Sequence, residues 1–184
     1  MRSESVVHTF LALFTVISFA ISTSAQEPTI KDLDGIIGSW EVEEVGFSGT
    51  NQEPAEQGTR TCSYILLDTY ILCETRSRFL KTGKERAYQF LINYNGLDKR
   101  FELVSIYSNW GRKNFDAITI QSNPKRWDLR GTPRVENGIE RRVWGVIEFM
   151  EPNRYVWTVR INKSTDAPTE WPIMFREVAR RKKN

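Results

Sequence analysis

The chain has 184 residues, of which 40% are hydrophobic and 27% charged, and its formal net charge at pH 7 is only +3. This length suits a single domain with a sizeable core, and the balanced charge gives no indication of a nucleic-acid partner. The one histidine, His8, lies near the N-terminus and no Gly-rich phosphate loop occurs, so the residues that most familiar enzyme classes require are missing.

The first 25 residues have the features of a signal peptide. Arg2 provides a positive start, residues 10–21 are almost entirely apolar, and residues 22–25 are small, with cleavage expected after Ala25. The apolar run of about 12 residues is shorter than the roughly 20 that span a bilayer. We therefore expect a secreted or periplasmic protein without stable membrane insertion, the alternative being a membrane anchor that stays attached. Residues 26–184 then form one domain.

Removal of this peptide would leave a mature protein without histidine. That absence excludes Ser-His-Asp and Cys-His nucleophilic sites, histidine metal sites and haem bound through a proximal histidine. We expect no metal and no cofactor.

The mature chain begins with a short lead-in, in which residues 31–37 predict a turn of helix capped by a glycine. Residues 38–45 alternate between apolar and charged side chains, which is typical of a half-buried strand. Residues 47–59 are rich in Gly, Asn, Gln, Glu and Pro. This composition predicts a mobile loop at the mouth of the fold.

The only two cysteines, Cys62 and Cys73, lie symmetrically about residues 67–68. A hairpin folded at that point places them opposite each other. A two-residue loop would make them a hydrogen-bonded pair, whereas a four-residue loop over residues 66–69 would make them a non-hydrogen-bonded pair with closer side chains. We predict a disulfide formed in an oxidising compartment, and the alternative is two buried free thiols.

Short apolar or alternating segments follow at a spacing of about ten residues, separated by turns. The predicted strands cover residues 74–79, 88–94, 101–107, 115–121, 127–130, 140–150, 154–161 and 171–178. No long helix is predicted. The pattern indicates an all-β fold, an antiparallel up-and-down β-barrel of about 8 to 10 strands, because closure removes exposed sheet edges. A β-sandwich is the alternative.

The end of the chain is basic, since residues 176–184 carry five basic side chains against Glu177. We interpret this run as a short C-terminal tail exposed to solvent, the alternative being contact with phosphates or anionic lipid. Residues 162–164 form the one N-x-S/T sequon, which makes Asn162 the candidate glycosylation site.

Two resemblances come from short motifs. Gly38-Ser39-Trp40 is similar to the G-x-W motif that opens lipocalins and other calycins. In those proteins the tryptophan packs across the closed end of the barrel under an arginine of the last strand, a role that the resemblance gives to Arg176. The second lipocalin motif, Thr-Asp-Tyr, has no match here.

The chain more closely resembles an uncharacterised lipocalin-like family of exported barrels, classed only as a domain of unknown function. The likeness rests on residues 38–40, on residues 67–72 followed by Glu74, and on residues 94–98 leading to Phe101. These segments occur in this order across nearly the whole mature chain. The resemblance implies a lipocalin-like, calycin-like barrel with an interior pocket, and it brings no assigned reaction.

Aromatic residues are the positive indication of a function. Six Trp, six Tyr and ten Phe are many for this length. A small barrel holds either side chains or one small ligand inside, and an aromatic lining suits a flat or acyl molecule. The candidate pocket residues are Trp40, Arg76, Tyr88, Phe90, Tyr107, Trp127, Trp144 and Trp157. The candidate polar groups for an anionic ligand head are Arg76, Arg78, Gln89, Asn93 and Arg142.

We expect an exported barrel that binds a small hydrophobic or amphipathic molecule without catalysis. The first alternative is a protein-interaction module with a barrel filled by side chains, which binds through an outer face or residues 47–59. The second is a hydrolase with two carboxylates about 5 to 10 Å apart. Its candidate carboxylates are Glu41, Glu43, Glu44, Glu140 and Glu148. The alternation of residues 38–45 instead favours an outward row of charges at Glu41 and Glu43.

Overall fold

The structure is a computed structural model that describes residues 27–48, 51–122, 125–136, 139–162 and 167–183. The predicted signal peptide lies outside these residues. The elements are η1 (Ile30–Ile36), β1 (Gly38–Ser48), β2 (Asn51–Ile65), β3 (Tyr70–Phe79), β4 (Glu85–Asn95), β5 (Arg100–Tyr107), β6 (Trp110–Ser122), β7 (Lys125–Gly131), β8 (Arg134–Glu136), β9 (Ile139–Glu151), β10 (Arg154–Asn162), η2 (Pro168–Glu170) and β11 (Ile173–Arg181). Among the described residues, none of the helices has the length and apolar character needed to cross a membrane.

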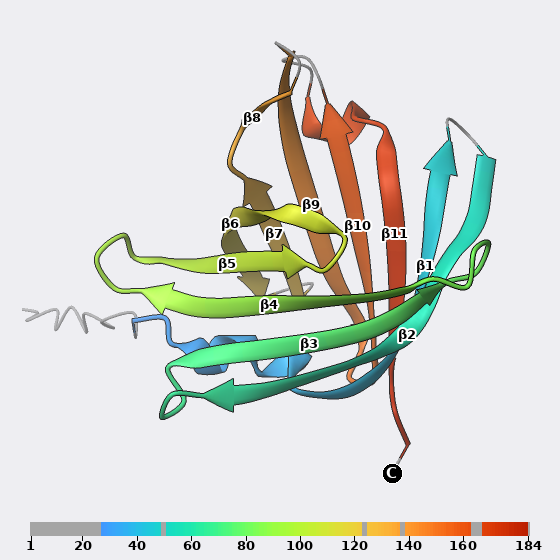
Figure 1. The fold of residues 1–184 in the computed structure, drawn as a ribbon. Helices are drawn as coiled ribbons and strands as arrows, with labels where there is room; N and C mark the ends of the chain where they lie inside the picture. Colours follow the sequence, from blue (N-terminus) through green and yellow to red (C-terminus); the bar gives the residue numbers. More distant parts are fainter. Residues whose placement is uncertain (1–26, 49–50, 123–124, 137–138, 163–166, 184) are drawn as a thin grey trace, which may run out of the picture.

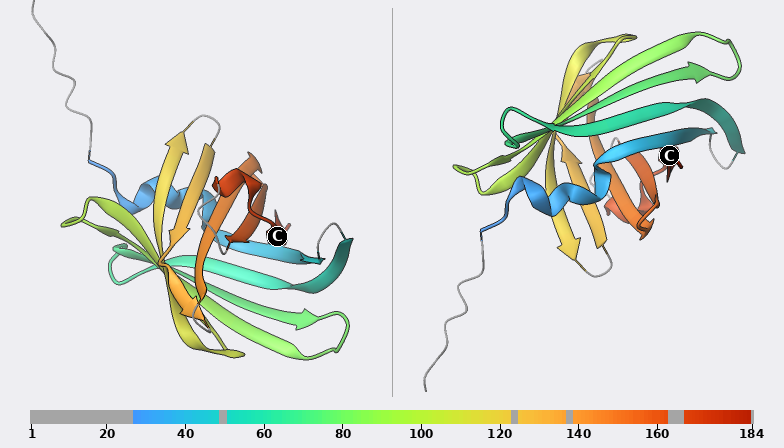
Figure 2. Two further views of the ribbon diagram at one scale, coloured as in Figure 1. Left: turned by 90° about the horizontal axis from the view of Figure 1, so that it is seen from above. Right: turned by 90° about the horizontal axis from the view of Figure 1, so that it is seen from below.

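Ten of the strands form a closed antiparallel barrel. Strands β1 to β7 each pair with the next, β7 pairs with β9, and β9, β10 and β11 continue the order until β11 pairs with β1. The short β8 pairs with residues 139–141 of β9, which come before the residues of β9 that pair with β7. Figures 1 and 2 show the wall curving around one interior with η1 at one end. The predicted up-and-down barrel is confirmed.

Alternation along each strand builds the core. In β4 the side chains of Tyr88, Phe90 and Ile92 are buried while their neighbours are more exposed, so apolar residues at every second position line the interior. The same alternation buries Phe101 and Leu103 on β5. A period of two fixes which side chains share a face, so Tyr88 and Phe90 point to the same interior.

The helix η1 closes one end of the barrel. Its residues Ile30, Leu33 and Ile36 are buried in the main core cluster. The predicted helical turn is present, but its glycine lies inside the element and the residue after its end is Ile37. The indole N–H of Trp40 donates to the carbonyl of Ile36 at 2.8 Å, which joins the helix to the first strand.

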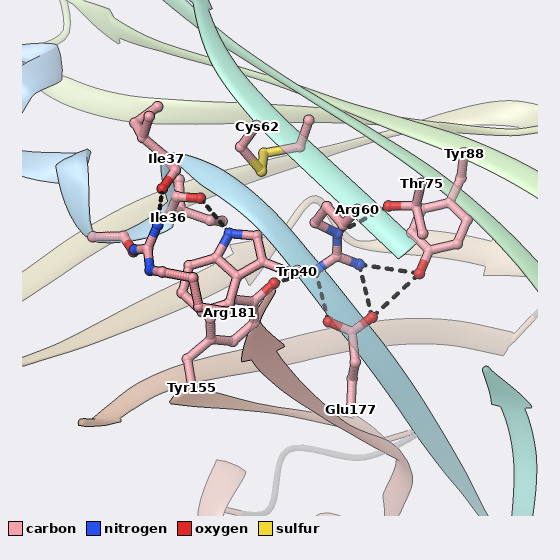
Figure 3. Close-up of a disulfide and its surroundings, with 12 residues drawn as sticks. Ile36, Ile37, Trp40, Arg60, Cys62, Thr75, Tyr88, Tyr155, Glu177 and Arg181 are labelled. Carbon is pink, nitrogen blue, oxygen red and sulfur yellow. Dashed lines mark hydrogen bonds and ion pairs between the residues drawn. A yellow bond between two sulfur atoms is a disulfide. The ribbon is translucent and has the colours of Figure 1, made fainter. Parts of the chain in front are cut away.

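The arginine that covers Trp40 is Arg181, not Arg176. The two residues are directly opposite on β1 and β11, and the guanidinium lies 4.3 Å from the indole centroid and donates to the carbonyl of Ile37 at 2.6 Å (Figure 3). Arg176 is an odd number of residues from Arg181, so it lies on the outer face and contacts Thr158. The prediction for Arg176 was wrong because the last strand runs further than expected.

The last strand covers Ile173–Arg181 instead of residues 171–178. Arg180 belongs to the sheet and pairs with Glu43 at 2.8 Å, while Arg181 caps the closed end. Most of the basic run is thus strand, and the predicted tail is limited to the residues after Arg181.

The predicted loop at residues 47–59 is wrong, because β1 extends to Ser48 and β2 begins at Asn51. Its proline, Pro54, lies where the β1–β2 register shifts, a bulge at which proline is tolerated. Gly58 is required by close packing, since a Cβ there would come 2.2 Å from the carbonyl oxygen of Arg76. The Gly and Pro residues that suggested a loop therefore shape a bent strand.

The disulfide between Cys62 and Cys73 is present. The two cysteines are register partners, and the connection is the four-residue loop over residues 66–69. Their Cα atoms are 4.0 Å apart, the short spacing of non-hydrogen-bonded pairs, so the second of the two predicted arrangements is correct. A disulfide is consistent with an extracellular or periplasmic location.

Candidate functional site

A cavity of about 540 Å³ lies in the half of the barrel away from η1. Its aromatic lining is Tyr88, Tyr107, Trp110, Trp157 and Phe175. Its aliphatic and glycine lining is Gly46, Leu129, Val143, Gly145, Val159, Ile161 and Met174. Its polar lining is Glu44, Arg86, Ser105, Asn109, Asn114, Asp116, Arg141 and Glu177. This mixture of an apolar body with a few polar groups is typical of small-molecule sites.

The aromatic side chains form two groups in contact. Tyr107 stacks on Tyr88 with ring centroids 5.3 Å apart, and Trp110 lies 6.2 Å beyond it. Trp157 meets Phe175 edge to face at 5.6 Å and Phe90 at 5.2 Å. Flat rigid walls of this kind offer a large apolar contact area at a low cost in conformational entropy.

Gly145 leaves room for the indole of Trp157. A Cβ at this glycine would lie 2.9 Å from the indole nitrogen and 3.3 Å from the Cβ of Leu129. The indole can therefore lie close against β9 and bound the cavity without filling it.

The buried polar atoms at the cavity include two that have no hydrogen-bond partner among the described residues. They are the indole nitrogen of Trp157 and the carboxamide oxygen of Asn114. Trp157 is 7% exposed and Asn114 is 8% exposed. One is a donor and the other an acceptor, and buried groups of this kind are normally satisfied. A ligand with both an acceptor and a donor would satisfy them.

A buried ion pair, drawn in Figure 3, includes Glu177 of the cavity lining. The guanidinium of Arg60, on a residue 1% exposed, donates to both carboxylate oxygens of Glu177 at 2.6 and 2.7 Å. Thr75, Tyr88 and Tyr155 provide its remaining acceptors.

These contacts keep Arg60 charged. Burial lowers the pKa of the guanidinium, but Glu177, Tyr155 and Tyr88 together outweigh burial, and the net pKa lies above the usual value. Burial also raises the pKa of Tyr88 and Tyr155, so both hydroxyls remain protonated and can donate. This network is a fixed support and offers no free charge.

A second charged group lies nearer the opening. Arg86 contacts Glu56 at 2.9 Å and Glu44 at 3.4 Å, and its guanidinium lies 4.7 Å from the centroid of Tyr88. Burial raises the pKa of Glu44 to about 7, an effect that Arg86 opposes and the carboxylates of Glu56 and Glu177 increase. Glu44 is therefore a carboxyl group of the cavity wall that titrates near neutral pH.

The structure brings only some of the predicted pocket residues together. Tyr88, Tyr107 and Trp157 line the cavity, and Phe90 packs behind Trp157. Trp40 is buried at the closed end. None of these positions tests whether a ligand binds.

The remaining predicted pocket residues lie elsewhere. Trp127 is buried against Phe149, away from the cavity lining. Trp144 points to the outer face, where it forms a separate cluster with Trp171 and donates to Asp128 at 2.9 Å. The prediction that Trp144 lines the pocket was wrong. Successive side chains of a strand point to opposite faces, and the next residue, Gly145, faces inward.

The predicted polar groups for an anionic head lie outside the cavity. Arg76, Arg78, Gln89 and Arg142 are exposed, and Asn93 is half-buried between positions that face inward. The interior charges are instead Glu44, Glu56, Arg60, Arg86, Asp116, Arg141 and Glu177. Alternation could have identified them, since Arg86 is in phase with Tyr88. Asn162, the candidate glycosylation site, is the last residue of β10 and is half-buried.

No family model matches the chain, and no curated protein matches it. Its fold is similar to that of Rv2717c from M. tuberculosis, with a TM-score of 0.57 and 12% identity over 85% of this chain and 98% of that one. It is also similar to the S-type phycobiliprotein lyase CPES from Guillardia theta, with a TM-score of 0.54 and 10% identity over 85% and 94% of the two chains.

A protein of unknown function from the DUF3598 family of Nostoc punctiforme matches with a TM-score of only 0.29 and 7% identity, over 84% of this chain and 99% of that one. The first two comparisons show the barrel fold alone. Membership of a lipocalin-like family of unknown function stays a prediction.

Proposed function

We propose that the protein is an exported barrel that binds a small amphipathic molecule in the cavity, without catalysis. The observation that carries the proposal is the cavity of about 540 Å³, with aromatic walls and two buried polar atoms, on Trp157 and Asn114, that lack partners among the described residues. A dry apolar filling would leave both atoms unsatisfied, at a cost of about 1 to 3 kcal/mol each.

The two alternative functions have less support. An interaction module with a filled barrel fits poorly with an interior volume of this size. A two-carboxylate hydrolase would draw on Glu44 and Glu177, which are register partners and both line the cavity. However, both oxygens of Glu177 accept hydrogen bonds from Arg60, so Glu44 is the one carboxyl group of this pair that keeps an oxygen for a substrate. A single such group suits recognition better than paired acid–base chemistry.

The test is binding of the neutral dye N-phenyl-1-naphthylamine, followed by its fluorescence, together with native mass spectrometry of the purified protein. Gly46 lines the cavity, and a Cβ there would meet Ala55 at an ordinary 3.6 Å. Gly46→Phe should therefore fold and fill part of the cavity, whereas Gly46→Ala adds only a methyl group.

We expect the wild type and Gly46→Ala to bind the dye, and Gly46→Phe to bind at least about tenfold more weakly while melting normally. Equal binding by Gly46→Phe would place the dye elsewhere. Absence of both dye binding and a co-purified molecule in the wild type would refute the proposed function.

A further inference from the structure

Three interior carboxylates lie side by side on adjacent strands. Glu44 on β1 is the register partner of Glu56 on β2 and of Glu177 on β11. All three point into the barrel, with side chains that are 16%, 2% and 2% exposed. Like charges placed opposite each other across strands repel, so this row requires compensation.

Among the residues that the structure describes, Arg60 and Arg86 contact these three carboxylates. Arg60 is committed to Glu177 through two short hydrogen bonds. Arg86 contacts Glu56 more closely, at 2.9 Å, than Glu44, at 3.4 Å. The incompletely compensated carboxylate is Glu44, and it is the most exposed of the three and lines the cavity.

The rest of the lining does not remove this excess. Asp116 and Arg141 contribute one charge of each sign. Across the described residues, the cavity and its supporting network thus hold four carboxylates and three guanidinium groups. Tyr107 and Trp110 add ring faces, which attract cations electrostatically.

A second observation points to the same kind of ligand. The buried carboxamide oxygen of Asn114, on β6, accepts no hydrogen bond from any described residue. It lies on a different wall from Glu44, and both groups call for hydrogen-bond donors. Donors on the ligand would satisfy both walls.

We propose that the cavity is selective for amphipathic amines, which place one ammonium group at Glu44 and an apolar body against the aromatic walls. This inference rests on the proposed function and adds the charge of the ligand. The ammonium supplies the missing positive charge of the interior, and a charge-assisted hydrogen bond to a carboxylate in a largely buried site is strong. Anionic ligands instead meet a carboxylate that Arg86 compensates only in part.

If an ammonium group binds at Glu44, the affinity for amines should depend on the protonation of this side chain. The charged or titratable groups that face it are Arg86 from β4, Glu56 from β2 and Glu177 from β11. Because burial raises the pKa of Glu44 to about 7, the free protein holds a proton there in mildly acidic solution. An amine must displace that proton, so its affinity should fall about tenfold for each pH unit below 7 and level off above it.

Three probes with one apolar body test the proposal by titration calorimetry: 4-phenylbutylamine, 4-phenylbutanol and 5-phenylpentanoate. At pH 8 we expect the amine to bind at least about tenfold more tightly than the alcohol, and the acid to bind most weakly. Glu44→Gln should reduce the amine preference to about twofold or less and abolish the pH dependence. Glu43→Gln, on the outward neighbour whose side chain is 61% exposed, should keep both.

Several outcomes would overturn the inference. These are equal binding of amine and alcohol, tightest binding of the acid, an amine preference that survives in Glu44→Gln, and binding of none of the three probes. In each case the proposed function still stands if the neutral dye binds the wild type and is excluded by Gly46→Phe. If the dye does not bind either, both proposals fail.

Discussion

The raised pKa of Glu44 predicts how the unfolding free energy of the protein changes with pH, and this prediction can be tested without a ligand. The carboxyl group is largely buried, opposite two other carboxylates, and its pKa is raised to about 7 chiefly by burial. Glu44→Gln keeps the size and shape of the side chain but removes its charge and its titration. The difference in unfolding free energy between the variant and the wild type should therefore depend on pH.

The sign follows from the pKa in each state. In the unfolded chain this carboxyl ionises near its ordinary value of 4.5, and in the folded protein near 7. Below pH 4.5 both states are protonated and Glu44 imposes no penalty. As pH rises toward 7 the unfolded state ionises first, so the folded wild type loses stability progressively. The full loss above pH 7 is about 3 kcal/mol, since one pKa unit corresponds to about 1.4 kcal/mol.

Urea unfolding with the disulfide intact measures this directly at pH 4.5, 6 and 8. Relative to its difference from the wild type at pH 4.5, Glu44→Gln should gain about 3 kcal/mol at pH 8, with most of the change between pH 5 and 7. Glu43→Gln removes an exposed carboxylate and should differ from the wild type by no more than about 1 kcal/mol at every pH. A pH-independent difference for Glu44→Gln, or a loss of stability at pH 8, would refute the reasoning.

Two further predictions concern the framework of the barrel. Glu177→Gln leaves the buried guanidinium of Arg60 uncompensated and should lower the free energy of unfolding by about 3 to 5 kcal/mol in urea, whereas the pair Arg60→Met and Glu177→Leu should recover much of it. A loss below about 1 kcal/mol for Glu177→Gln would contradict the burial of this pair. Replacing Cys62 and Cys73 by serine should cost about 2 to 3 kcal/mol, because the bridge closes a loop with a sequence separation of only 11. Labelling of both thiols in the unreduced wild-type protein would contradict the disulfide.

The barrel could be predicted because its determinants are local and periodic. Alternation with a period of two assigned Tyr88 and Phe90 to the interior, and the spacing of Cys62 and Cys73 defined one hairpin. The error at residues 47–59 has a physical cause. Gly and Pro indicate only that the backbone departs from a regular strand. A bulge or a close approach of two strands requires these residues just as a loop does.

The site was predicted less well because residue type was given more weight than phase. Arg76 and Arg86 are equally basic, but only Arg86 is in phase with the inward Tyr88. Buried ion pairs also contradict the usual expectation that charged residues lie outside, and their partners come from strands far apart in the chain. Arg60 and Glu177 are 117 residues apart, and no local pattern could pair them.

The Arg60–Glu177 ion pair and the carboxyl group of Glu44 have different physical roles in the interior. Arg60 and Glu177 form a satisfied pair, and such a pair contributes little stability compared with well-packed apolar residues of the same volume. A stability argument therefore does not account for it. The pair does fix a carboxylate in register with Glu44. Burial is the main reason that the pKa of Glu44 is raised to about 7, and the carboxylates of Glu56 and Glu177 add to this effect. The fixed pair therefore contributes to the proton affinity of a carboxyl group on the cavity wall, and that contribution is a role that stability alone does not give it.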